Sequence, residues 1–97
     1  MERRLLESTP YEGLKHGTHI DVEVTYSKDR SPRGYYIRVS PVTHENGMES
    51  FILFSDISQL LIKTNRYSAK QFEQAVELGR AAAPELIKQV LEREKAA

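Results

Sequence analysis

Histidine, carboxylate and hydroxyl side chains are the first places to look for chemistry in this sequence. His16 and His19 lie three residues apart where a strand is expected to begin, and His44 lies elsewhere, so their imidazoles have no ordered metal-ligand spacing. None of the 97 residues is cysteine, which removes thiolate ligands and disulfides. The sequence therefore predicts no metal site and no cofactor.

Paired carboxylates would be needed for general acid–base catalysis. Asp21 and Glu23 share one face of a predicted strand, about 7 Å apart. Arg38 is expected opposite Glu23, and a cross-strand ion pair is the simpler account of that pair. No glycine-rich phosphate loop is present, and no acid is placed to orient a hydroxyl near His44. We expect a protein that is not an enzyme and has no small-molecule substrate.

Basic residues are unevenly distributed along a chain whose net charge is zero. Residues 26–38 hold four Lys or Arg and one Asp, and residues 63–70 hold three Lys or Arg, which gives +6 against −6 for the remainder. If the fold brings the two segments together, they form a basic zone, whereas apart they are ordinary solvated loops. Tyr36 is expected on an outer sheet face, where a ring stacks bases while cations hold phosphates. The candidate nucleic-acid-binding residues are Lys28, Arg30, Arg33, Tyr36, Arg38, Lys63, Arg66 and Lys70.

Two strands with alternating polarity are expected at 18–27 and 35–43. Pairing Tyr26 with Tyr35 brings apolar residues opposite apolar ones throughout, which favours that register. Asn46-Gly47 suits a two-residue hairpin turn. This turn leads to a third strand at 49–54, in which Val42 faces Phe51 and Val39 faces Phe54.

Helices are expected after the strands. The spacing of Ile57, Leu60 and Leu61 indicates a short helix ending near Asn65, and Ser68 and Gln71 match a capping box before a long apolar stripe. Pro84 predicts a kink or break in that last helix. Residues 1–17 are interpreted as a weakly ordered or docked terminal segment. The expected fold is one α+β domain over residues 1–97: a three-stranded antiparallel meander at 18–54, with helices at 55–95 packed on one face.

Two apolar surfaces are left without an evident cover in this arrangement. Self-association would cover both, so we expect a homodimer, unless residues 1–17 fold back over the sheet. The candidate partner residues are Val42, Phe51, Leu53, Leu86, Ile87, Val90 and Leu91.

A family resemblance adds context. Residues 29–42 (DRSPRGYYIRVSPV), Met48-Glu-Ser-Phe51, Leu53-Phe-Ser55, Asn65-Arg66 and Ser68-Ala-Lys70 resemble a group of small uncharacterised bacterial proteins, often encoded in mobile elements such as conjugative transposons. The resemblance covers about residues 24–78 and implies an accessory role in a mobile element, without assigning functional residues. No apolar run approaches the roughly 20 residues that span a bilayer, so we expect a cytoplasmic protein without a membrane partner. We thus predict a non-enzymatic interaction module, with nucleic-acid binding as the alternative function and an enzyme of unknown type as the second alternative.

Overall fold

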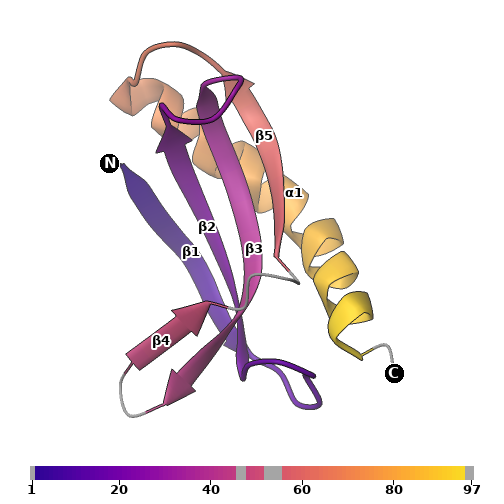
Figure 1. The fold of residues 1–97 in the computed structure, drawn as a ribbon. Coiled ribbons are helices and arrows are strands. Elements are labelled where there is room, and N and C mark those ends of the chain that lie inside the picture. Colours follow the sequence, from indigo (N-terminus) through magenta and orange to yellow (C-terminus); the bar gives the residue numbers. More distant parts are fainter. Residues whose placement is uncertain (1, 46–47, 52–55, 96–97) are drawn as a thin grey trace.

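In the computed structural model, an antiparallel sheet carries one long helix across a single face (Figure 1). The structure describes residues 2–45, 48–51 and 56–95. Within these residues there are five strands and one helix, so the α+β class is confirmed. The elements are β1 (Arg3–Pro10), β2 (His19–Ser27), β3 (Gly34–Glu45), β4 (Met48–Phe51), β5 (Ile57–Lys63) and α1 (Ala69–Lys95).

The expected three-stranded meander is present as β2, β3 and β4, in the expected register. Tyr26 lies opposite Tyr35, Val22 opposite Val39, and Val42 opposite Phe51. The Asn46-Gly47 turn itself lies outside the described residues. Val39 lies opposite Ile57 of β5, and its expected partner Phe54 lies outside the described residues.

Two further strands enlarge the meander. β1 pairs with β2, so residues 3–10 form a strand of the sheet, which the sequence did not predict for the weakly ordered or docked terminal segment. β5 pairs with the first half of β3, beside the part of β3 that β4 pairs with, so the short helix expected at 57–65 is wrong. Each of these two strands contains a bulge, with Leu6 as the extra residue in β1 and Leu61 in β5.

The core lies between α1 and the inner face of the sheet. Alternate residues of β2 and β3, including Val22, Val24 and Ile37, are buried against one stripe of the helix. At Gly79 the helix comes so close to β2 that a Cβ atom would lie 2.8 Å from Val24 Cγ2. The inner leucines of the two bulges, Leu6 and Leu61, pack on either side of this crossing.

α1 continues through Pro84 as one helix, so the expectation of a break at Pro84 is wrong, and the alternative of a kink there is not shown. Proline has no backbone N–H, so the carbonyl of Arg80, four residues before Pro84, lacks its usual helical hydrogen bond. Both residues are exposed, which places this gap on the solvent side of the helix. Ser68 Oγ caps the helix by accepting a hydrogen bond from Gln71 N at 3.1 Å. Ser68 N donates to the Tyr35 hydroxyl at 2.9 Å, which ties the helix start to β3. No helix in the described part of the chain is long and apolar enough to cross a membrane.

Candidate nucleic-acid interface

The two basic segments meet at one end of the molecule. Antiparallel pairing of β3 with β5 places Lys63 opposite Gly34, and Thr64 N donates to Arg33 O at 3.0 Å. The loop from β2 to β3 therefore lies beside the connection from β5 to α1, as the upper end of Figure 1 shows. This is the arrangement in which the sequence predicted a basic zone.

Five exposed cations form this surface, which we call the basic end: Lys28, Arg33, Lys63, Arg66 and Lys70. Across residues 2–45, 48–51 and 56–95, none of the five has an ion-pair partner within 4.0 Å. Lys70 lies in the first turn of α1, which contains no acidic residue, so the partial positive charge of the helix start adds to the cations. The surface is therefore electropositive although the chain is neutral.

Tyr67 adds a partly exposed ring to the basic end. Tyr67 directly follows Arg66 in the chain and is 40% exposed. Its ring centroid lies 5.7 Å from that of Tyr26 and 6.0 Å from that of Phe72. Desolvation, followed by the nearby Glu2 carboxylate, raises the pKa of the Tyr67 hydroxyl. We did not identify Tyr67 from the sequence, because the segment around it was interpreted as the link between two helices.

The other three candidate residues lie on the outer face of the sheet. Tyr36 is only 6% exposed because the Arg30 guanidinium covers it, with Cζ 4.0 Å from the ring centroid. The Tyr36 hydroxyl donates to Pro32 O. Tyr36 projects to the predicted face, but it does not provide the exposed stacking ring that we expected there.

Arg30 and Arg38 line a concave site on this face, the outer pocket, with a volume of about 210 Å³. Two ion pairs involve its lining residues. Arg3 Nε of β1 lies 3.6 Å from Glu23 Oε2 of β2, and Arg38 Nε of β3 lies 3.1 Å from Oδ2 of Asp56, the residue before β5. This arrangement differs from the expected Glu23–Arg38 pair, although those two residues are opposite each other in register. The outer pocket is lined by Arg3, Glu23, Thr25, Ser27, Arg30, Tyr36, Arg38 and Ser58.

The candidate partner residues separate into two groups. Val42, Leu86 and Val90 are at most 5% exposed and belong to the core of the single chain, so they are unavailable to a partner. Ile87 and Leu91 are half-buried. The side chain of Phe51, and Leu53 altogether, lie outside the described residues.

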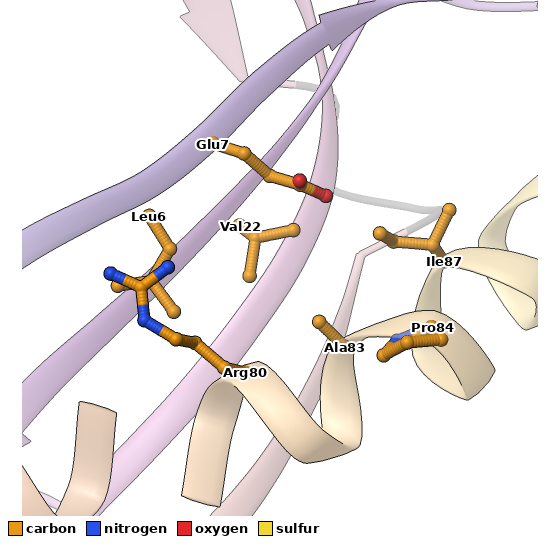
Figure 2. A pocket seen from close by; sticks show the side chains of 7 residues that line it. All are labelled: Leu6, Glu7, Val22, Arg80, Ala83, Pro84 and Ile87. Carbon is orange, nitrogen blue, oxygen red and sulfur yellow. The ribbon is translucent and has the colours of Figure 1, made fainter. Parts of the chain in front are cut away.

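Ile87 and Leu91 line a groove beside α1, formed by two adjoining cavities of about 210 and 380 Å³ that share Pro84 and Ile87. Figure 2 shows the first cavity, where Leu6 and Val22 of the strands face Ala83 and Ile87 of the helix. Lys88, Glu92 and Lys95 border the second cavity. We call the two cavities together the α1 groove.

His16 and His19 make hydrogen-bonding contacts with neighbouring residues. His16 N donates to Glu94 Oε1 at 2.7 Å, and His16 Nδ1 lies 3.3 Å from Glu94 Oε2. His19 Nδ1 lies 2.7 Å from the Thr18 hydroxyl. Within the described ranges, no group of three His, Cys, Asp or Glu side chains is arranged to hold a metal ion.

Comparisons with protein-family models, with curated proteins and with solved structures give no match for this chain. The resemblance to mobile-element proteins thus stays a prediction, and the functional argument depends on the geometry alone.

Proposed function

We propose that the protein is a non-enzymatic binding module that contacts the phosphate backbone of nucleic acid through the basic end. The observation that carries the proposal is the meeting of the two basic segments, brought about by the pairing of Gly34 with Lys63. Five exposed cations at one end of a neutral chain repel one another, and a polyanion would relieve that repulsion.

The composition of the basic end favours a sequence-tolerant contact. Lys and Arg on two loops suit phosphate oxygens, which carry no sequence information directly. Tyr67 adds one partly exposed ring, which suits stacking on a single-stranded base. We therefore expect single-stranded nucleic acid to bind at least as well as duplex.

The experiment is fluorescence anisotropy with labelled single- and double-stranded oligonucleotides over a range of salt concentrations. Affinity should fall as salt rises, with a slope of roughly 0.7 to 0.9 per phosphate contact in a plot of log K against log salt. Replacing Arg33, Lys63 and Arg66 together by Gln should weaken binding about tenfold or more at low salt. The same replacement should reduce the slope by about two to three.

The matched control replaces Lys15, Arg80 and Arg93 by Gln, which removes the same charge from exposed positions outside the basic end. This control should bind nearly as well as the unchanged protein. The proposal would be overturned if no binding occurs at low salt, or if the two triple variants weaken binding equally.

A second proposed role is self-association through the α1 groove. Its floor is apolar, and its rim carries charges of alternating sign at Lys88, Glu92 and Lys95. Two antiparallel copies of α1, with Ile87 of one against Leu91 of the other, would place Lys88 within reach of the partner copy's Glu92. The groove is therefore complementary to itself, which a twofold dimer requires.

Light scattering over a concentration series measures this association. We expect a dimer whose molar mass falls toward the monomer in Lys88→Glu and is restored in the double variant Lys88→Glu with Glu92→Lys. Leu78→Glu, on the same helix but outside the groove, is the control and should stay dimeric. A monomer at the highest soluble concentration, or a dimer insensitive to Lys88→Glu, would contradict this role.

A further inference from the structure

Three guanidinium groups line the outer pocket, together with a single carboxylate side chain. Arg3, Arg30 and Arg38 converge there from β1, the β2–β3 loop and β3. The carboxylates beside them are those of Glu23 in the pocket and Asp56 next to Arg38. Arg38 is thus paired with Asp56, whereas Arg3 and Arg30 share the pocket with Glu23, the one carboxylate among the lining residues.

Arg3 and Arg30 are each held in place by contacts that use only part of their guanidinium group. A guanidinium carries five N–H donors. Arg30 uses Nη1 to donate to Ser58 Oγ at 2.6 Å while its plane covers the Tyr36 ring. Arg3 is the first residue of β1, and its Nε lies 3.6 Å from Glu23 Oε2. Both side chains line the cavity of about 210 Å³, and the polar contacts described use one nitrogen of each guanidinium group.

We propose that the outer pocket binds a phosphomonoester group, with Arg3 and Arg30 as its main ligands. A phosphomonoester carries about −1.5 to −2 charge near neutral pH and offers three acceptor oxygens, which match paired guanidinium groups. Thr25, Ser27 and Ser58 add hydroxyl donors around the same cavity. The group could belong to a free small compound or to the 5′ end of a nucleic-acid strand. The proposal does not depend on the basic end, whose cations lie outside the pocket lining.

The first test is an NMR titration of the protein with inorganic phosphate, with acetate as a singly charged comparison. Phosphate should shift the amide signals of pocket residues such as Thr25, Ser27 and Ser58, and should bind more tightly than acetate. Arg3→Gln and Arg30→Gln should each weaken phosphate binding about tenfold or more, because each loses charged hydrogen bonds. Arg93→Gln, which removes the same charge from an exposed position in the last turn of α1, should leave phosphate binding unchanged.

The second test separates the two sources of the group. Ribose 5-phosphate is compared with one short oligonucleotide that has either a 5′-phosphate or a 5′-hydroxyl. A preference for the 5′-phosphorylated strand that Arg30→Gln abolishes supports a strand end as the ligand. Equal binding of ribose 5-phosphate and the phosphorylated strand supports a free small compound.

The proposal is overturned if millimolar phosphate causes no shifts in the pocket, if acetate binds as tightly, or if Arg30→Gln and Arg93→Gln act alike. Failure at the basic end would appear differently, as loss of salt-dependent binding to both forms of the oligonucleotide. The two proposals can therefore fail separately.

Discussion

Arg4 connects the first strand to the helix by contacts with two neighbouring residues of α1. Its Nη1 and Nη2 donate to the two carboxylate oxygens of Glu73 at 3.1 and 2.6 Å, and its Cζ lies 5.2 Å from the Phe72 ring centroid. The fork-to-fork geometry favours the ionised carboxylate. The hydrogen bond from Arg4 accordingly lowers the pKa of Glu73 and raises that of Arg4.

Because the pKa of Glu73 is lower in the folded chain than in the unfolded chain, the pair stabilises the fold above the unfolded pKa. That contribution is lost as the pH falls through the folded pKa. Both side chains are exposed, so we expect a small effect that salt reduces. In an NMR carboxyl titration, Arg4→Gln should return the pKa of Glu73 toward its ordinary value, whereas Arg93→Gln should not. A Glu73 pKa that does not change in Arg4→Gln would contradict this account.

For Tyr36, the sequence predicted the face of the sheet to which the side chain projects but not its exposure. Strand alternation correctly predicts the face to which Tyr36 projects. It does not predict that Arg30, six residues earlier in the chain, folds back over the ring, because that contact depends on the path of the loop. Exposure of a ring on a sheet face therefore could not be inferred from the strand pattern.

The two strands that sequence patterns missed share one local cause. Leu5-Leu6 and Leu60-Leu61 each break the polar–apolar alternation, and such doublets are typical of a helix. In the fold each doublet sits at a bulge: Leu5 and Leu60 are exposed on the outer face, while Leu6 and Leu61 pack toward α1. A bulge inserts one residue and shifts the alternation by one position. The regular strands β2 and β3 had no such interruption and were predicted in register.

The far end of α1 is fixed by Glu94, whose side chain is only 1% exposed. Its carboxylate accepts from His16 N, and its backbone O accepts from Lys15 N at 3.1 Å. Glu94→Ala would remove the charged acceptor of the part-buried His16 N–H, so we expect a loss of about 1.5–3 kcal/mol in the free energy of unfolding. Urea denaturation measures it.

Glu92→Ala, two residues away and exposed, is the control and should change the unfolding free energy by no more than about 0.5 kcal/mol. Equal midpoints and slopes for the Glu94→Ala and Glu92→Ala variants would show that the contact with His16 does not hold the helix end.

At the scale of the whole molecule, the candidate site depended on one misinterpreted segment. The basic residues could be identified from the sequence, but their meeting could not, because residues 57–63 were expected to form a helix. As a strand antiparallel to β3, this segment returns Lys63 to the level of Gly34 and sets Arg66 near the β2–β3 loop. Arg3 was not among the predicted site residues for a similar reason. Residues 1–17 were interpreted as a weakly ordered or docked terminal segment, which assigns Arg3 no neighbours in the sheet.

The bulges also bear on how the protein behaves when it is concentrated. β1 and β5 each pair along one side only within the described chain, and such open strands invite pairing with other molecules. An extra residue twists an open strand and interrupts its regular row of amide and carbonyl groups. Leu6 and Leu61, the bulge residues that pack near Gly79, therefore have a second consequence. We expect β1 and β5 to be poor templates for fibre growth, even though Leu5 and Leu60 leave apolar surface on these strands.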